Sequence, residues 1–220
     1  MIGKIVIGKS FGGCLRYVVQ KQDAEILFAD GVRTANTSQM TRDFNMQRKL
    51  KPSLGNAVGH ISLSWSVQDA DKLSNTSMLE MAKEYLDKMQ VKDTQLLIVR
   101  HNDRSHPHLH LIYNRVNNEG NVISDRFQHK KNITACKEVT IRHGLYVATG
   151  KTMVNRHSLK GRDKEKYRMF DTISEERRRS LNWKDFEKNL LKKDISLKFK
   201  YAGKTDIVQG ISFHKGEYTM

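Results

Sequence analysis

The sequence predicts an α+β fold of two layers, in which helices flank a central and mainly antiparallel sheet. Three observations carry this prediction. Residues 57–66 alternate polar and apolar side chains, which is typical of a half-buried strand. Two strand patterns at residues 96–99 and 108–116 are joined by the polar loop 102–107, as in an antiparallel hairpin. Residues 76–89 place apolar side chains at helical spacing, so we expect a helix that covers the sheet.

The N-terminal elements follow from capping and turn residues. Residues 2–7 are mostly apolar and predict an opening strand, after which Ser10 can cap a helix near residues 11–21. A short apolar stretch at residues 25–29 ends at an Asp-Gly turn. Residues 38–50 then suit a polar helix, which a Lys-Pro pair closes.

Two further helices belong to the same part of the chain. Thr76 or Ser77 can cap the covering helix. Residues 130–143 favour another helix, ended by Gly144. We expect the first 145 residues to form one core.

The C-terminal part has a different composition. Residues 150–166 are basic and weakly apolar, so we expect a mobile boundary there. Residues 174–193 favour helical structure, and residues 195–201 with 207–213 favour a hairpin around the turn 202–204. Residues 146–220 are therefore interpreted as a basic helical and β-hairpin extension, packed on the core or tethered to it.

Charge indicates the kind of partner. The 220 residues hold 39 Lys and Arg against 24 Asp and Glu, a net charge of +15 with a pI of about 9.8. The excess is concentrated in residues 126–220, which hold 23 basic and 11 acidic side chains. Such a chain suits a polyanion, and nucleic acid is the expected class.

Hydropathy and cysteine content indicate the compartment. The mean hydropathy is −0.64, and no apolar run approaches the roughly 18 residues of a spanning helix, so we expect no membrane insertion. The two cysteines, Cys14 and Cys136, cannot build a disulfide framework. Lys4 interrupts the N-terminal apolar run, which does not suit a secretory signal. We expect a cytoplasmic protein.

Four of the nine histidines fall within residues 101–110. On a strand, His108 and His110 project from one face, while the leucine between them projects from the other. If the loop 102–107 closes a hairpin, His101 lies beside His108 and three imidazole nitrogens converge. Three protein ligands leave coordination positions open, which is the catalytic arrangement of a metal site. Asp103 can accept an imidazole N–H, whereas the role of His106 stays open.

Two motifs carry a resemblance to a known family. The first is the string His101-x-Asp103-x-x-His106-Pro107-His108-Leu109-His110-Leu-Ile-Tyr-Asn114-Arg115. It resembles the metal-binding motif of the relaxase/mobilisation nuclease family, within the His-hydrophobic-His endonucleases. The opening Gly8-Lys9-Ser10-Phe11-Gly12-Gly13-x-x-x-Tyr17 resembles the first motif of that family. The resemblance covers residues 1–145, whereas residues 151–220 resemble only the variable region after the core.

The resemblance implies a site- and strand-specific nickase and strand transferase acting on single-stranded DNA. Tyr17 would be the nucleophile, forming a 5′-phosphotyrosyl intermediate at a transfer origin and initiating conjugative mobilisation. Its phenol must lose a proton, and Asp103 and His106 are both candidates for the base. The family implies Mg²⁺ or Mn²⁺ at the three histidines. Imidazoles are softer ligands than Mg²⁺ prefers, so Mn²⁺, Co²⁺, Ni²⁺ or Zn²⁺ should bind more tightly.

Partners follow from the same resemblance. We expect origin-of-transfer DNA in a bacterial cytoplasm, with relaxosome accessory proteins and a secretion coupling protein as possible companions. The candidate DNA-contacting residues lie beside the motifs in the sequence or share the imidazole face; they are Lys9, Arg16, Asn114, Arg115, Arg126, Lys130 and Lys131.

Three other functions are consistent with parts of the sequence. A rolling-circle replication initiator belongs to the same superfamily, but a tyrosine that precedes the histidine pair favours the relaxase. A zinc hydrolase would use the same three histidines, but the chain lacks an HExxH helix and this reading does not explain Tyr17 or the net charge. A non-catalytic DNA-binding module would keep the histidines as structural residues.

Overall fold

The structure is a computed structural model that describes residues 1–148, 154–203 and 205–220. The chain divides into two compact units, Met1–Val147 and Ala148–Met220. Each unit has its own sheet and its own apolar core.

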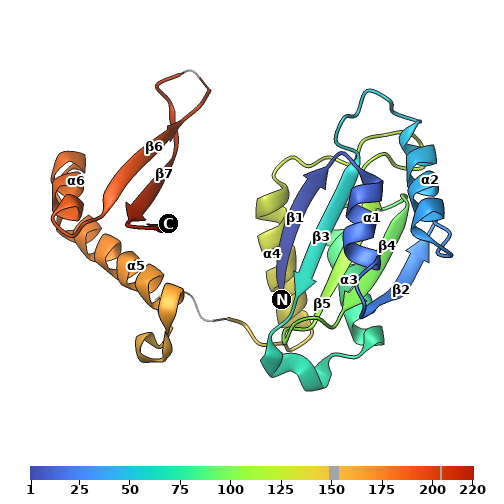
Figure 1. Ribbon diagram of the computed structural model, residues 1–220, viewed down its shortest axis with the longest axis horizontal. Coiled ribbons are helices and arrows are strands. Elements are labelled where there is room, and N and C mark those ends of the chain that lie inside the picture. The colour runs from blue at the N-terminus through green and yellow to red at the C-terminus, as the bar shows by residue number, and fades with distance from the viewer. Residues whose placement is uncertain (149–153, 204) are drawn as a thin grey trace. The chain divides into compact units, whose positions relative to one another are not determined.

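A five-stranded sheet forms the centre of the first unit (Figure 1). Its strands are β1 (Ile2–Gly8), β2 (Ala24–Asp30), β3 (Val58–Ser64), β4 (Leu96–His101) and β5 (His108–Asn114). They lie in the order β1-β3-β5-β4-β2, and every neighbouring pair is antiparallel. The predicted hairpin is the pair β4 and β5, at the middle of the sheet.

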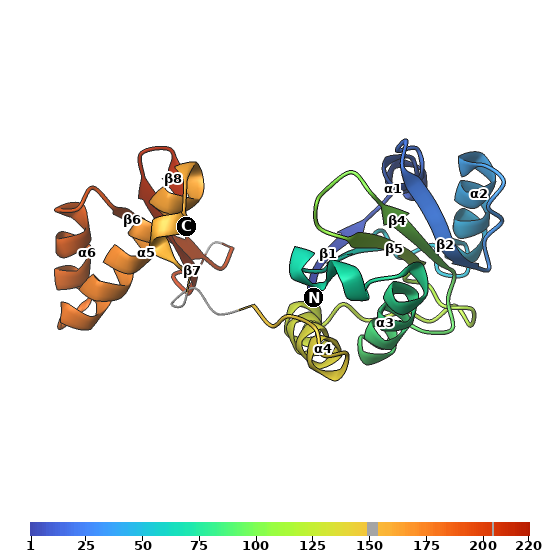
Figure 2. The same ribbon diagram turned by 90° about the horizontal axis from the view of Figure 1, so that it is seen from below.

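Helices cover both faces of this sheet (Figure 2). One face carries α1 (Phe11–Val19) and α2 (Thr37–Arg48), and the other carries α3 (Asn75–Lys88) and α4 (Gln128–Arg142). The short 3₁₀ helix η1 (Val67–Lys72) leads into α3. The α+β class and the antiparallel sheet are confirmed, but the sheet is the middle of three layers rather than one of two.

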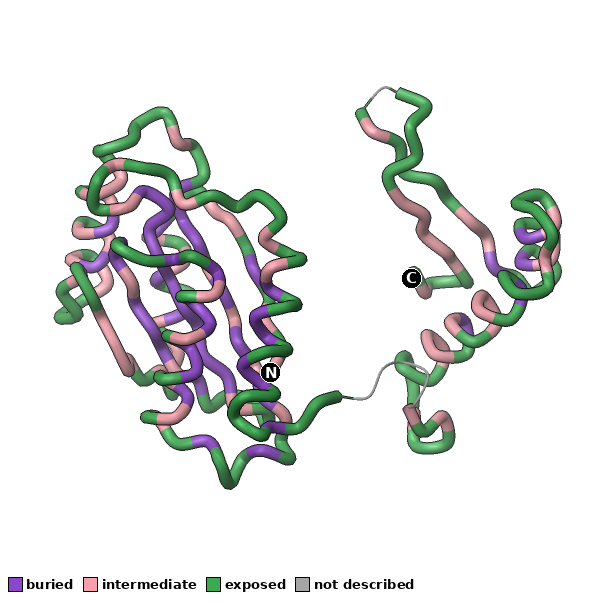
Figure 3. Tube along the Cα trace, turned by 180° about the vertical axis from the view of Figure 1, so that it is seen from behind, coloured by how far each residue is buried: buried purple, intermediate pink, exposed green. Residues whose placement is uncertain are grey.

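Two apolar clusters explain the three layers. Ile61, Leu109 and Leu111 pack with Tyr85 of α3 and Val139 of α4 on one side. On the other face the strands contribute fewer apolar side chains, because they also carry the polar side chains of His60, His101, His108 and His110 there. Its cluster consists of Phe11, Leu15, Val18, Met40, Phe44, Ala57, Val58, Leu97, Val99 and Ile112. The central strands are consequently buried along most of their length (Figure 3).

Side-chain caps fix where the helices begin. The hydroxyl of Ser10 accepts a hydrogen bond from the Gly13 amide at 3.1 Å, as predicted for the start of α1. Helix α3 begins earlier than expected, because its cap is Ser74 rather than Thr76 or Ser77. Ser77 instead completes a capping box by bonding back to the Ser74 amide.

The second unit packs two helices against a small sheet. Its elements are η3 (Arg156–Ser158), α5 (Gly161–Arg179), α6 (Trp183–Leu191), β6 (Ser196–Tyr201), β7 (Val208–Lys215) and β8 (Tyr218–Thr219). The strands lie in the order β6-β7-β8, and the core is Met169, Phe186, Leu190 and Ile195. Nowhere in the described ranges does a helix combine the length and apolar character needed to cross a membrane.

The structure adds detail to two expectations for the second unit. The segment 174–193, predicted to be helical, holds the end of α5 and all of α6, separated at residues 180–182, where the Asn182 side chain caps α6. The segment 150–166, expected to be a mobile boundary, contains the start of α5 at Gly161. Helix α5 buries only Met169 and Glu176, so its polar sequence lacks the apolar periodicity that identifies helices. Residues 150–153 of that segment and Lys204 of the hairpin turn lie outside the described residues.

Close packing across β3 and β5 gives a test of the fold. Gly59 pairs with Tyr113, and a Cβ at position 59 would overlap the Tyr113 ring. We expect Gly59→Ala to lower the free energy of unfolding by about 1–3 kcal/mol, measured by urea denaturation. Gly55→Ala is the matched control, since a Cβ there meets nothing within 4 Å. Equal stability of the two variants would contradict this packing.

Candidate metal centre and active site

Three buried imidazoles meet at the end of the β4–β5 hairpin. His101 is the last residue of β4 and pairs in register with His108, the first residue of β5. His110 lies two residues further along the same face. The ring centroids are 4.2 Å apart for His101 and His110, 5.5 Å for His101 and His108, and 5.4 Å for His108 and His110. One ligand atom from each ring lies within 4.8 Å of the others.

The protein contacts one nitrogen of each imidazole, and Asp103 also contacts the second nitrogen of His108. Nε2 of His101 bonds to the Val18 carbonyl oxygen at 2.6 Å, and Nδ1 of His108 bonds to the His106 carbonyl oxygen at 3.0 Å. Nδ1 of His110 bonds to Nε2 of His60 at 2.9 Å. Each contact fixes the ring orientation, as is typical of metal-ligating histidines.

The second nitrogen of each ring, Nδ1 of His101 and Nε2 of His108 and His110, is the atom that would bind a cation. Nδ1 of His101 is buried and has no hydrogen-bond partner among the described residues. A buried polar atom without a partner is costly unless something else binds it. Three neutral imidazoles form the donor set of a catalytic divalent metal site, and His101, His108 and His110 would hold the ion.

Burial favours the neutral form of His101 and His110. Loss of hydration, followed by the neighbouring His101, His60 and His108, lowers the pKa of His110 to about 3. Burial also lowers the pKa of His101 and of His60. Because protonated imidazole has no lone pair to donate, the lowered pKa of His101 and of His110 keeps these two ligands available at neutral pH.

Asp103 and Lys21 close one side of the cluster. The Asp103 carboxylate lies 2.6 Å from Nζ of Lys21 through Oδ2 and 3.2 Å from Nε2 of His108 through Oδ1. The hydrogen bond from Lys21 holds the pKa of Asp103 below its ordinary value. Asp103 is thus an ionised carboxylate that contacts one of the three imidazoles.

Tyr17 lies at the open side of the cluster. One face of α1 is buried through Phe11, Leu15 and Val18. Tyr17 lies outside this buried face and is 53% exposed. Its ring centroid lies 6.0 Å from that of His110 and 6.2 Å from that of His60. The Lys21 ammonium lies 5.2 Å from the Tyr17 ring centroid. An exposed phenol therefore stands beside a buried imidazole cluster.

A protein-family comparison matches this part of the chain. The model described as "Relaxase: MobA/VirD2-like, nuclease domain" matches residues 17–145, a range that includes Tyr17 and the three imidazoles. The chain belongs to the MobA/VirD2-like relaxase family. The resemblance seen in the sequence is confirmed, and the nuclease domain makes this relaxase a DNA endonuclease. No curated protein matches the chain at a significant level.

Only some of the predicted DNA contacts of the relaxase lie near this cluster. Arg16 is exposed and precedes Tyr17 on α1, whereas Lys9 is exposed near the opposite end of that helix. Lys130 and Lys131 lie on α4, which packs on the sheet face opposite the imidazoles. Arg126 is exposed just before α4, beside the Phe127 ring.

Two predicted contacts are interior residues in the structure. Asn114 is fully buried, donates to the Phe44 carbonyl oxygen and to Gln95, and accepts from the Val116 amide. Arg115 is 4% exposed, and its guanidinium donates to backbone carbonyls and pairs with Asp125 at 3.0 Å. These partners occupy both side chains, so neither is placed to contact DNA.

Sequence reasoning did not single out two residues of this site, His60 and Lys21. His60 lies on β3 and reaches His110 across the strand pair. The alternation of residues 57–66 places His60 on the polar face of that strand, and this was the sequence signal that could have indicated it. Lys21 follows α1 and meets Asp103 only because the loop after β4 folds back to it. No local pattern predicts that contact.

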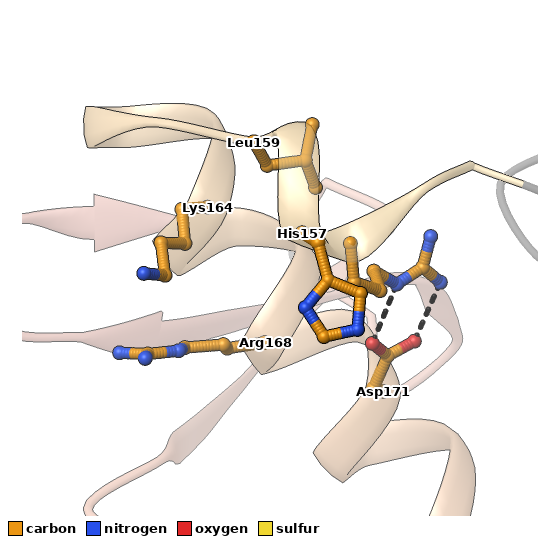
Figure 4. A pocket seen from close by; sticks show the side chains of 6 residues that line it. His157, Leu159, Lys164, Arg168 and Asp171 are labelled. Carbon is orange, nitrogen blue, oxygen red and sulfur yellow. Dashed lines mark hydrogen bonds and ion pairs between the residues drawn. The ribbon is translucent and has the colours of Figure 1, made fainter.

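The second unit of the relaxase has a recess of another kind (Figure 4). Its lining includes the cationic side chains of Arg156, Lys164 and Arg168, together with His157 and Asp171. Asp171 binds the Arg156 guanidinium through two contacts of 2.7 Å. The recess is a positively charged surface without the imidazole geometry of the first unit.

The imidazole cluster predicts metal binding at one site. We expect one Mn²⁺ ion per chain in isothermal titration calorimetry, and a rise of the melting temperature with Mn²⁺. His101→Ala should lower the affinity by at least about 100-fold, since one of three ligands is lost. His129→Ala is the control, because His129 is exposed on α4. Unchanged Mn²⁺ binding by His101→Ala would contradict the site.

His60 should act on the metal through His110. We expect His60→Ala to weaken Mn²⁺ binding by about 10- to 100-fold although all three ligands remain, because His110 loses the partner that orients it. His60→Gln keeps a polar group and should recover part of the affinity. Wild-type affinity in His60→Ala would show that the His60 contact does not support the site.

Proposed function

We propose that this relaxase cuts one strand of DNA at a specific site in a transfer origin and so initiates conjugative mobilisation. The enzyme would form a 5′-phosphotyrosyl bond through Tyr17. One observation carries the proposal, namely the exposed Tyr17 ring 6.0 Å from the buried His110 ring. Membership in the relaxase family supports DNA nicking in general.

The chemistry is a transesterification. The Tyr17 oxygen bonds to the scissile phosphorus, the bond from phosphorus to the 3′ oxygen breaks, and that oxygen takes up a proton to leave a 3′ hydroxyl. A divalent cation held by the three imidazoles would supply positive charge to the non-bridging phosphate oxygens. Mg²⁺ or Mn²⁺ would serve in the cell, and Co²⁺, Ni²⁺ or Zn²⁺ can substitute.

The neighbouring residues suit supporting roles. Lys21 brings positive charge toward the Tyr17 ring, which favours the phenolate that attacks. Asp103 pairs with Lys21 and contacts His108, so its main part would be to orient these two groups. Its low pKa makes it a weak proton acceptor, and His106 remains the other candidate for the base.

An uncovered strip of the sheet suits the single strand. Lys4, Ser62 and His110 lie in one cross-strand row, and Ile2, Ser64 and His108 lie in the next. Helix α1 leaves the β1 end of these rows uncovered, since Ile2 is 70% exposed and Val6 of the same face is 47% exposed. An unpaired strand laid here would bring a phosphate between Tyr17 and the imidazoles.

We assign the chemistry to residues 1–145 and much of the electrostatic attraction to residues 146–220. The basic recess of the second unit supports this assignment. The cytoplasm of a bacterium would be the compartment, and relaxosome accessory proteins and a secretion coupling protein would be the partners.

A covalent adduct tests the proposal. Wild-type protein incubated with short single strands and Mn²⁺ should gain the mass of a DNA fragment on the peptide that contains Tyr17, as seen by mass spectrometry. Tyr17→Phe should form no adduct, because phenylalanine lacks the attacking oxygen, yet it should still bind the strands. Tyr146→Phe, which alters a 39% exposed tyrosine elsewhere, is the control. Adduct formed by Tyr17→Phe at the wild-type rate would refute the assignment.

A further inference from the structure

Three exposed aromatic side chains form a row in the second unit. Trp183 begins α6, and Phe199 and Tyr201 lie on β6. They are 58%, 38% and 47% exposed. The ring centroids of Trp183 and Phe199 are 6.0 Å apart, and those of Phe199 and Tyr201 are 6.3 Å apart. These three residues are called the aromatic row below.

The core of the unit covers only part of this sheet face. Leu197 and Phe213 pair in register and pack against the core, whereas Tyr201 pairs with Val208 further along. Val208 and the preceding Ile207 are 46% and 67% exposed. A contiguous exposed apolar surface of this kind indicates a binding partner.

A core residue, Phe186, supports one end of the aromatic row. The Trp183 ring meets the ring of Phe186 at 5.7 Å, and Phe186 is buried in the core. Neighbouring rings of the row are inclined by 68° and 49°, so they do not stack on one another. Since each ring is at least 38% exposed, part of its surface stays accessible to a flat group from outside the chain.

Positive charge lies on the same edge strand as two of the rings. Lys198 and Lys200 alternate with Phe199 and Tyr201 along β6, so they project from the other face of this edge strand, where both are exposed. Within the described residues, no ion pair involves Lys184, Lys198 or Lys200. Residues 148–220 hold 18 Lys and Arg against 10 Asp and Glu. The matching partner has flat apolar groups on a chain of negative charges.

We propose that the aromatic row, with Lys198 and Lys200, is a second binding surface for single-stranded DNA, separate from the imidazole site. Unpaired bases stack on the rings, and the DNA backbone follows the exposed edge of β6, where the long lysine side chains can reach its phosphates. Stacking tolerates any base, so this surface holds the strand without reading its sequence. The inference rests on the proposed single-stranded substrate and not on the chemistry of Tyr17.

Tryptophan fluorescence reports this surface directly. The chain has two tryptophans, and Trp65 is only 2% exposed, so contact quenching reports Trp183. The probe is an oligothymidylate of roughly 15 nucleotides, titrated without divalent metal to prevent cleavage. We expect saturable quenching of the full chain by this single strand, and much weaker quenching by a duplex of equal length.

Variants separate stacking from charge. Tyr201→Ala and Phe199→Leu should each weaken binding by about 5- to 100-fold, the usual loss per stacked base. Phe199→Leu keeps an apolar side chain, so circular dichroism should confirm that it folds. Leu181→Ala removes a 94% exposed apolar side chain near Trp183 and should bind normally. The pair Lys198→Gln and Lys200→Gln should reduce the slope of log affinity against log salt by about 1.4.

Several results would overturn the inference. They are the absence of quenching, equal quenching by the duplex, or row variants that bind as tightly as Leu181→Ala. Shielding of Trp183 from acrylamide in the free protein would show that another part of the chain or a second copy covers the row. Adduct formation at Tyr17 is scored separately. Quenching without any adduct would remove only the proposed function, and an adduct without quenching would remove only this inference.

Discussion

The register between β4 and β5 is the constraint on which the site depends. Pairing His101 with His108 places three imidazoles on one face, and the same register buries Leu109 and Leu111 on the other. A slip of one residue would turn the leucines into the cluster and expose the sheet's apolar face. The hydrophobic effect therefore fixes the geometry of the metal ligands, although no ligand contributes to the apolar core.

The position of α1 converts this cluster into a site. Val18 anchors the helix in the apolar core and also accepts the hydrogen bond of His101 through its carbonyl oxygen. Because Tyr17 adjoins Val18, the contact that fixes an imidazole also fixes the phenol beside it. Ile2 and Val6 of β1 stay exposed on the face that carries α1, so this edge of the sheet is not covered by the helix.

The sequence predicts what depends on local alternation and capping. The pairing of His108 and His110 on one face and the cap at Ser10 required no knowledge of the sheet. The burial of Asn114 and Arg115 depends on α2 and on the loops before β3 and after β5, which no local pattern reveals. His60 likewise reaches His110 only through the strand order β1-β3-β5, which places two distant segments side by side.

Electrostatics explains why the charge is distributed unevenly. Residues 1–125 hold 16 basic and 13 acidic side chains, against 23 and 11 in residues 126–220. A site for a divalent cation cannot be surrounded by unpaired positive charge, because repulsion between cations at short distance would weaken metal binding. Lys21, which lies beside the cluster, is accordingly paired with Asp103. Most of the excess positive charge accordingly lies outside the part of the chain that carries the imidazoles, since residues 148–220 hold 18 Lys and Arg against 10 Asp and Glu.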